Sequence, residues 1–282
     1  MNARLLVIAA AVLFSTGGAA IKSAAFSGLQ VSSLRAAIAA AALLLWVRGR
    51  IVWSPRVLVI GTVYAATLTL FVTSTKLTTA ANAIFLQSTA PLWIVVLAPM
   101  LIGERIRRRE GVFLAAMAGG LTLCFAGALQ ATTTAPNPAL GTVLGVLSGI
   151  VWAFTLIGFR WGESHQQGIG ISSVVAGNII AFLIGLPFLW PLPPAPLAGW
   201  LTLAYLGVIQ IALAYIFLTR AVGRLPALDV SLLLLLEPVL NPVWTWAIYG
   251  EDPGRWTIAG GALIVTATGV KTLLDARATS LE

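Results

Sequence analysis

Two ionisable residues lie deep inside apolar stretches of this 282-residue sequence. Glu237 stands about ten residues into one such stretch, and Arg35 is the other deep charge. Ionisable groups at that depth usually face a bundle interior or a water-filled cavity. Pro238 removes a backbone donor next to Glu237, which frees carbonyl groups that need other partners. Glu237 is therefore a candidate proton carrier, a candidate ligand for an ammonium group, or a partner of the freed backbone, and its pairing with Arg35 stays open.

The residues that enzymes and metal sites need do not cluster in this sequence. The single cysteine, Cys124, lies in an apolar run, and the single histidine, His165, has Glu163 near it but no second ligand. We therefore expect no catalytic residue, no metal and no cofactor. Two functions other than solute transport stay open as alternatives. An intramembrane enzyme acting on a lipid or amphipathic substrate would need clustered acids or an activated nucleophile. A small-solute channel would need a filter sequence or a ring of charge.

Polar and aromatic residues recur at helical spacing along several apolar stretches and so share helix faces. A mostly apolar and aromatic surface with scattered amides and hydroxyls suits an amphipathic organic solute better than a bare ion. The alternative for each single residue is an interhelical hydrogen bond or a packing contact. The candidate substrate-binding residues are Tyr64, Thr67, Asn82, Thr89, Trp93, Trp152, Thr155, Gln210, Glu237, Asn241 and Trp244.

Composition places the chain in a lipid bilayer. It is 59% hydrophobic and 9% charged, whereas soluble domains carry about a quarter charged residues. A span needs about 20 mostly apolar residues, so the predicted fold class is an all-α polytopic membrane protein with ten transmembrane helices. The ten apolar stretches are residues 5–24, 31–47, 57–75, 81–102, 111–129, 140–161, 169–190, 197–219, 227–249 and 256–274.

A repeat with an offset of 147 residues divides the chain into two related halves. Asn82 aligns with Asp229, and no gap is needed across some thirty positions. The predicted halves are residues 1–130 and 139–282, each with five spans. Because five is odd, the halves must run in opposite orientations, and inverted repeats are typical of transporters whose substrate site lies between them.

Basic residues predict the orientation of the chain. With the N-terminus inside, thirteen Lys and Arg residues fall in the cytoplasm, and three, Lys22, Lys76 and Arg255, fall outside. We expect a bacterial inner-membrane protein with both termini cytoplasmic. The net charge of +8 thus belongs to short loops, which argues against nucleic acid as a partner. Glycines spaced four apart in the 140–161 stretch favour close helix packing or a dimer contact, hence a monomer or weak homodimer.

Short motifs recur in the two halves, and their residues are Lys22, Arg35, Ala80, Pro91, Gly103, Glu104, Arg105, Ala221, Arg224, Pro226, Ala227, Glu237, Pro238, Gly250 and Glu251. With these residues, ten spans and two inverted halves, the chain resembles the EamA-type ten-span exporters of the drug/metabolite transporter superfamily. The resemblance implies a basket of helices around a central cavity lined by spans 1, 3, 4, 6, 8 and 9, with spans 5 and 10 at the periphery. It also implies export of small metabolites, prominently amino acids and particularly aromatic ones, by alternating access.

One departure from symmetry concerns the acid before the repeated proline. The first half has Ala90 before Pro91 where the second half has Glu237 before Pro238. A symmetric proton relay of paired acids is therefore not expected.

The predicted topology can be checked with single cysteines in a chain whose Cys124 has been replaced. Thr133→Cys and Pro194→Cys are expected to react with an impermeant thiol reagent added from the periplasmic side, because the charge bias puts both positions outside. Arg107→Cys is the matched inside position and should remain unlabelled. Labelling of position 107 in intact cells would contradict the orientation.

Overall fold

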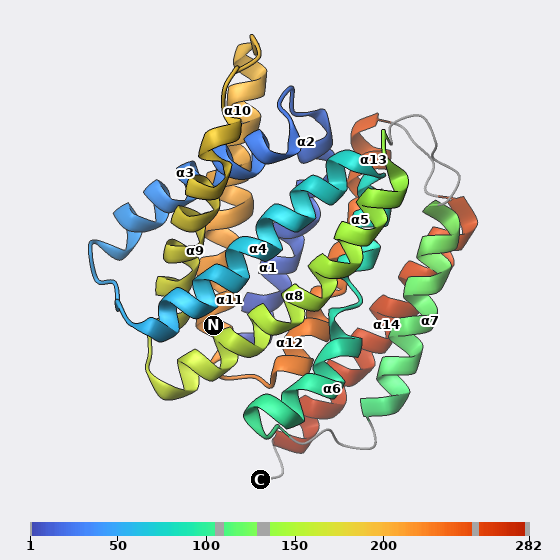
Figure 1. Ribbon diagram of the computed structural model, residues 1–282. Coiled ribbons are helices and arrows are strands. Elements are labelled where there is room, and N and C mark those ends of the chain that lie inside the picture. Colours follow the sequence, from blue (N-terminus) through green and yellow to red (C-terminus); the bar gives the residue numbers. More distant parts are fainter. Residues whose placement is uncertain (1, 105–109, 129–135, 250–253, 280–282) are drawn as a thin grey trace.

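The computed structural model describes residues 2–104, 110–128, 136–249 and 254–279, and every regular element in these ranges is a helix (Figure 1). The all-helical fold predicted from composition is thereby confirmed for the described residues. One element, η1, is a 3₁₀ helix, and another, η2, is a π-helix. The elements are α1 (Ala3–Ser15), α2 (Gly17–Ser23), α3 (Gly28–Val47), α4 (Pro55–Leu77), α5 (Ala80–Gln87), α6 (Ala90–Ile102), α7 (Glu110–Ala128), α8 (Pro138–His165), α9 (Ile169–Gly185), η1 (Leu186–Phe188), α10 (Leu197–Tyr205), η2 (Leu206–Leu213), α11 (Ala214–Val222), α12 (Ala227–Leu234), α13 (Leu236–Tyr249) and α14 (Gly254–Thr279).

Among the described residues, seven helical stretches are long and apolar enough to cross a membrane. Three of them are the single helices α3, α4 and α8. The other four join consecutive elements, namely α1 with α2, α5 with α6, α9 with η1, and α10 with η2 and α11. Two shorter apolar helices, Glu110–Leu123 and Ile258–Lys271, lie within α7 and α14.

Short polar residues begin the long helices. At α3, the Ser27 side chain accepts from the Gln30 backbone while the Gln30 side chain accepts from the Ser27 backbone, which is a capping box. At α4, the Ser54 hydroxyl caps the first turn and Pro55 occupies the first helical position. An Asn-Pro pair begins α8 in the same way.

Two helices break inside the bundle at positions related by the repeat. α5 gives way to α6 after Gln87, and α12 gives way to α13 after Leu234. The first and last residues of α5 and α12 differ by the same 147 positions. Pro91 and Pro238 follow the two breaks and lack the N–H that would continue the preceding helix.

At the first break, two side-chain hydroxyls donate to backbone carbonyls that also accept a backbone N–H. Ser88 Oγ donates to the Ile84 carbonyl and Thr89 Oγ1 to the Leu86 carbonyl, each at 2.7 Å. Backbone carbonyls inside a membrane must find such partners because lipid offers none. Gly149 of α8 allows this close approach, since a Cβ there would stand 2.5 Å from the Leu86 oxygen.

Glu104 connects the two halves of the chain at the end of α6. Its carboxylate accepts from Arg160 Nε at 2.8 Å and from the backbone N–H of Ala227 at 2.9 Å. Arg160 also donates to the Gly223 carbonyl. Ala227 is the first residue of α12, whose N-cap residue Pro226 makes no side-chain cap. Glu104 therefore caps a helix of the other half, where negative charge is favoured.

Two lysines join α2 and α4 at the opposite end of the bundle. Lys22 Nζ donates to the carbonyls of Thr75 and Thr78 at 3.1 and 2.7 Å, at the C-terminus of α4. Lys76 Nζ donates to the Ala24 carbonyl at 2.6 Å, at the C-terminus of α2. Cations stabilise helix C-termini, so each lysine serves as the cap of the other helix.

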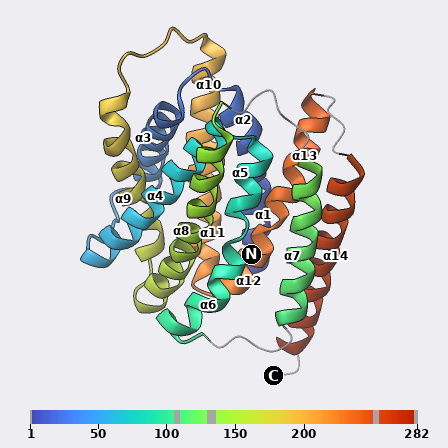
Figure 2. The same ribbon diagram turned by 45° about the vertical axis from the view of Figure 1, so that its right-hand side comes forward.

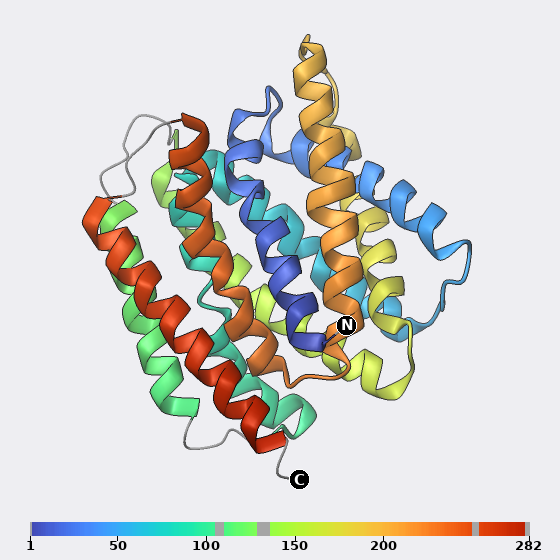
Figure 3. The same cartoon turned by 180° about the vertical axis from the view of Figure 1, so that it is seen from behind.

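α7 and α14 lie side by side along one edge of the bundle, with α3 and α9 at the opposite edge (Figure 2). Seen from behind, α1 runs between α13 and α11 (Figure 3). A buried ion-pair cluster holds the peripheral pair: Lys271 of α14 reaches Glu110 of α7 and Asp229 of α12, each at 2.8 Å.

The crossing of α4 and α9 leaves no room for a side chain on Gly177, where a Cβ would stand 2.5 Å from the Gly61 oxygen. We expect Gly177→Ala to lower the free energy of unfolding by about 1–3 kcal/mol, the usual cost of overpacking. Thermal unfolding in detergent measures it. Gly269→Ala is the matched control, because a Cβ on Gly269 meets nothing within 4 Å. A Gly177→Ala protein as stable as wild type would contradict the tight crossing.

Candidate functional site

A small cavity lies at the centre of the bundle, beside the helix breaks and the π-helix. Its volume is about 30 Å³, which holds roughly one or two water molecules and is far below the about 300–1,000 Å³ of ordinary ligand pockets. Both halves of the chain contribute to it. The lining residues are Phe14, Arg35, Thr67, Leu68, Phe71, Gln87, Trp152, Gln210, Ile211, Tyr215 and Glu237.

The Arg35 guanidinium is buried at this cavity, and the residue is 1% exposed. Its Nη1 donates to Gln210 Oε1 at 3.2 Å, whereas its Nε has no hydrogen-bond partner in the part of the chain that the structure describes. Gln210 belongs to η2, and π-helical turns are frequent at functional sites. Two glycines let these groups approach: a Cβ on Gly17 would stand 2.6 Å from the Gln210 amide nitrogen, and one on Gly207 would stand 2.9 Å from the Arg35 carbonyl oxygen. The local backbone is thus shaped to bring an amide to the buried cation.

Glu237 contributes a half-buried side chain to the same cavity. Within the described part of the chain, its carboxylate accepts no hydrogen bond and forms no ion pair, so Arg35 and Glu237 share a cavity without pairing. Pro238 falls in the first turn of α13, where the backbone N–H groups have no intrahelical partner in any case. The contacts therefore give no support to a role for Glu237 in satisfying freed backbone groups.

The neutral polar groups around the cavity are paired with one another. Thr67 Oγ1 and Thr155 Oγ1 lie 2.8 Å apart, and Gln87 Nε2 donates to Ser148 Oγ at 2.8 Å. The two charged lining residues, Arg35 and Glu237, have no ion-pair partner among the described residues. No group of three or more His, Cys, Asp and Glu side chains among the described residues is placed to hold a metal ion.

Aromatic rings close the cavity on one side. The Tyr215 ring packs against those of Phe14, Tyr64, Trp152 and Phe159, with centroid distances between 4.8 and 6.3 Å. These are edge-to-face contacts, which stabilise aromatic clusters beyond their buried area. One turn after Tyr215, Thr219 and Arg220 of α11 line a second, separate pocket. The layer of aromatic rings around Tyr215 therefore lies between the central cavity and this second pocket.

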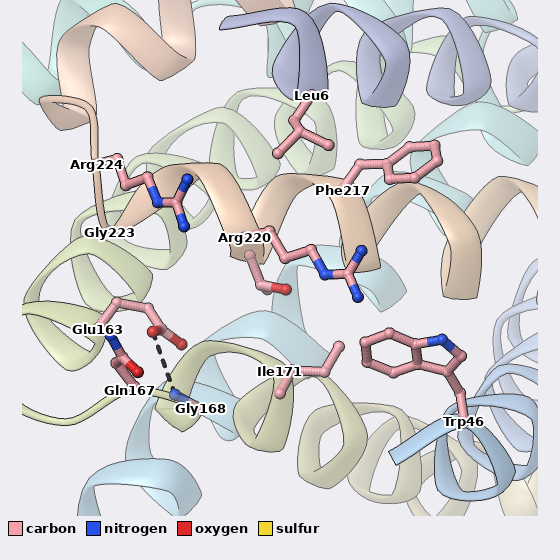
Figure 4. Close-up of a pocket in the computed structure, with 11 residues that line it drawn as sticks. Leu6, Trp46, Glu163, Gln167, Gly168, Ile171, Phe217, Arg220, Gly223 and Arg224 are labelled. Atoms are coloured by element: carbon pink, nitrogen blue, oxygen red, sulfur yellow. Dashed lines mark hydrogen bonds between the residues drawn. The ribbon is translucent and has the colours of Figure 1, made fainter. Parts of the chain in front are cut away.

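That second pocket has a volume of about 560 Å³ and lies among α1, α9, α11 and the end of α8 (Figure 4). Arg220 stacks on the Trp46 ring at 4.9 Å, and neither Arg220 nor Arg224 forms an ion pair with a described residue. The Glu163 carboxylate accepts from two backbone N–H groups at the start of α9, at 2.7 and 3.2 Å. The pocket therefore presents a net positive surface.

A third pocket, of about 550 Å³, lies beyond the central cavity between α2, α10 and α13. Tyr205 donates to Thr16 Oγ1 and Trp244 Nε1 donates to Ser15 Oγ, both at 2.7 Å. The three spaces follow one another along the first span: Leu6 lines the second pocket, Phe14 the cavity and Thr16 the third pocket.

Four of the eleven predicted substrate-binding residues line the central cavity, namely Thr67, Trp152, Gln210 and Glu237. Tyr64 and Thr155 lie directly behind it, in contact with lining residues, and Trp244 lines the third pocket. The other four do not line these spaces: Asn82, Thr89, Trp93 and Asn241. Three of these take part in interhelical or local bonds: Asn82 Nδ2 donates to Thr142 Oγ1 at 3.0 Å, and Trp93 Nε1 donates to Thr89 Oγ1 at 3.4 Å.

Several lining residues were not among the predicted ones, notably Phe14, Arg35, Gln87 and Tyr215. Ordinary helical spacing puts Phe217 on the face of Gln210, but Phe217 lines the second pocket. The π-helix adds residues to the turn and so brings Tyr215 round to the cavity. For Arg35 a signal existed, since it was one of two deep charges. Because Arg35 belongs to the second span, the cavity is lined by that span as well as by the spans that the family resemblance implied.

Comparison of the sequence with known protein families shows which family this chain belongs to. Residues 1–126 and 139–271 match the EamA-like transporter family. The chain belongs to this family. The membership predicted from the motifs, within the drug/metabolite transporter superfamily, is thereby confirmed.

This EamA-like transporter is 28% identical over 274 residues to the pseudopaline exporter CntI of Pseudomonas aeruginosa, in strains UCBPP-PA14 and PAO1, with 93% of each chain covered. A solved crystal structure with 22% sequence identity superposes with a TM-score of 0.78, over 98% of this chain and 97% of the other. At that identity the structural likeness shows the fold alone. Family and spans together make the chain a multi-pass membrane transporter.

Glu237→Gln keeps the shape of the side chain and removes its charge. We expect it to reduce solute counterflow at least tenfold while leaving the melting temperature unchanged, because the carboxylate has no structural partner among the described residues. Transport driven by a pH gradient, measured beside counterflow, separates the two roles: survival of counterflow alone assigns proton carriage, and loss of both assigns contact with the solute.

Glu163→Gln is the matched control, because that carboxylate accepts two backbone hydrogen bonds. Bonds to a charged group contribute about 1.5–3 kcal/mol each, so this variant should melt at a lower temperature. If Glu237→Gln lowered the melting temperature as much and transported normally per folded molecule, the assignment of Glu237 to the cavity chemistry would fail.

Proposed function

We propose that this protein is an inner-membrane exporter of amino acids, including aromatic ones, or of related small metabolites, working by alternating access. The observation that carries the proposal is the central cavity, where residues of both halves surround two charged groups, Arg35 and Glu237, that have no ion-pair partner among the described residues. A zwitterionic solute offers one partner to each. The aromatic wall formed by Phe14, Trp152 and Tyr215 suits an apolar side chain.

Movement of the helices is part of the proposal. A cavity of about 30 Å³ admits no amino acid, whereas the pockets on its two sides, of about 560 and 550 Å³, have the size of a small solute's site. Opening the aromatic layer joins the cavity to the second pocket. Opening the contacts near Thr16 joins it to the third. Alternating access requires that these two openings exclude each other.

The arrangement we propose is ten spans in two inverted five-helix repeats, residues 1–130 and 139–282, with both termini cytoplasmic. The related breaks after Gln87 and Leu234 support a duplicated architecture. The Arg-rich connections around Arg48 and Arg220 support a cytoplasmic location for the second pocket. In this orientation the solute enters beside Arg220 and leaves beside Trp244. We expect a monomer or a weak homodimer.

The solute is proposed to contact Thr67, Trp152, Gln210 and Glu237 in the cavity. Tyr64 and Thr155 would support that wall from behind. Trp244 would meet the solute in the third pocket. The remaining candidates, Asn82, Thr89, Trp93 and Asn241, would come into contact with it only in a more open form.

A second candidate solute is one resembling pseudopaline, favoured by the 28% identity to the pseudopaline exporter. This second candidate function differs from amino-acid export only in the solute; the membrane, the direction of transport and the alternating-access mechanism are the same. One panel of solutes therefore compares both.

The deciding experiment is counterflow in proteoliposomes that contain only this protein. Vesicles loaded with an unlabelled solute should accumulate the same solute in labelled form, for amino acids of increasing apolar size and for pseudopaline. Protein-free vesicles are the control. Accumulation of amino acids above the control supports the first candidate, and accumulation of pseudopaline alone supports the second. A panel in which nothing exceeds the control would overturn the proposal.

A further inference from the structure

We propose that Arg35 binds the carboxylate of the transported solute, and that Gln210 positions the guanidinium for this contact. The inference rests on the proposed export function and adds a chemical requirement to it. The solute must carry a carboxylate or an equivalent planar anion.

The first argument is the unsatisfied state of the Arg35 side chain. A guanidinium has five N–H donors, and within the described chain only one hydrogen bond is made, from Nη1 to Gln210 at 3.2 Å. Nε is buried without a partner. An unpaired charge inside a protein costs several kcal/mol, and a merely structural arginine would recover that cost from a neighbouring carboxylate. Arg35 forms no ion pair among the described residues.

The second argument is the place of the guanidinium. Arg35 lines the central cavity together with Glu237, which has no ion-pair partner in the described chain either. Two opposite charges that share a cavity and remain unpaired are arranged for a ligand that carries both charges. Arginine suits a carboxylate in particular, because its planar fork forms two parallel hydrogen bonds with the two oxygens.

The third argument is the distortion of the backbone around the contact. η2 presents Gln210 from a π-helical turn, and Gly17 and Gly207 leave the space that the Gln210 side chain and the Arg35 backbone occupy. A neutral amide accepts from the guanidinium without cancelling its charge. Gln210 therefore orients Arg35 and leaves it able to attract an anion.

The second pocket, through which the solute is proposed to reach the cavity, is positively charged, as Arg35 is. Arg220 and Arg224 line the second pocket without an ion-pair partner in the described ranges, and the Glu163 carboxylate there is occupied by backbone N–H groups. Positive charge at the entrance raises the local concentration of an anionic group. A carboxylate would thus be favoured both at the entrance and at the centre.

The test uses wild-type protein first, since it needs no variant that might fail to fold. Counterflow of labelled phenylalanine, leucine and alanine is competed with each unlabelled amino acid and with its carboxamide. The assay is run at about pH 6, below the usual α-amino pKa of about 7.7–8.0, so that the carboxamide keeps the ammonium group and the side chain but carries no anion. We expect the carboxamides to inhibit at least tenfold more weakly than the acids.

Gln210→Glu then places a carboxylate against Arg35 and neutralises it within the protein. We expect the ratio of acid to amide inhibition to fall toward one while the melting temperature is kept or raised, because an ion pair replaces a neutral contact. Gln166→Glu is the matched control: it makes the same chemical change at an exposed position at the end of α8 and should keep both transport and the ratio.

The outcomes separate this inference from the proposed function. Transport of amino acids with equal inhibition by acids and carboxamides would overturn the role of Arg35 and leave the export function standing. A folded Gln210→Glu protein that keeps the wild-type ratio would overturn the positioning role and the carboxylate contact together. Absence of any amino-acid counterflow would remove the proposed function and the inference with it.

Discussion

A guanidinium held inside a membrane-spanning bundle is the constraint around which the centre of this protein is organised. Arg35 is 1% exposed and has one hydrogen-bonding partner in the described chain. Retaining a charge there costs stability, and the surrounding elements limit that cost without abolishing the charge. A π-helix brings Gln210 within reach, while Gly17 and Gly207 omit the side chains that would obstruct the contact.

The breaks in the helices follow from the same demand for polar groups at mid-depth. A continuous helix satisfies its own backbone and presents only side chains, whereas a broken helix also has free carbonyl and N–H groups that need partners. After α5, the hydroxyls of Ser88 and Thr89 add a second donor to carbonyls that also accept a backbone N–H. The corresponding break after Leu234 places Glu237 at the start of α13, beside the cavity, where its carboxylate has no partner among the described residues.

The closed centre and the two outer pockets are held by different contacts at the two ends of the bundle. Glu104 bonds to Arg160 and to the first N–H of α12, so it joins elements of the two halves. At the other end, Lys22 and Lys76 cap each other's helices. Both sets are charge-assisted hydrogen bonds to groups that a helix terminus leaves unsatisfied. Such bonds fix the helix ends.

The sequence by itself determined the class of the protein, because apolar length and motif spacing are local properties of the chain. Membrane helices and membership of the EamA-like family were predicted from them and are confirmed. Helical spacing also selected four cavity residues, including Gln210 and Glu237. Only the tertiary structure added Tyr215 and Phe14 and brought Arg35 to the cavity, because a π-helix and the two helix breaks change which residues share a face. Whether a polar residue lines the cavity or bonds to a neighbouring helix, as Asn82 does, depends on which faces meet, and local spacing does not contain that information.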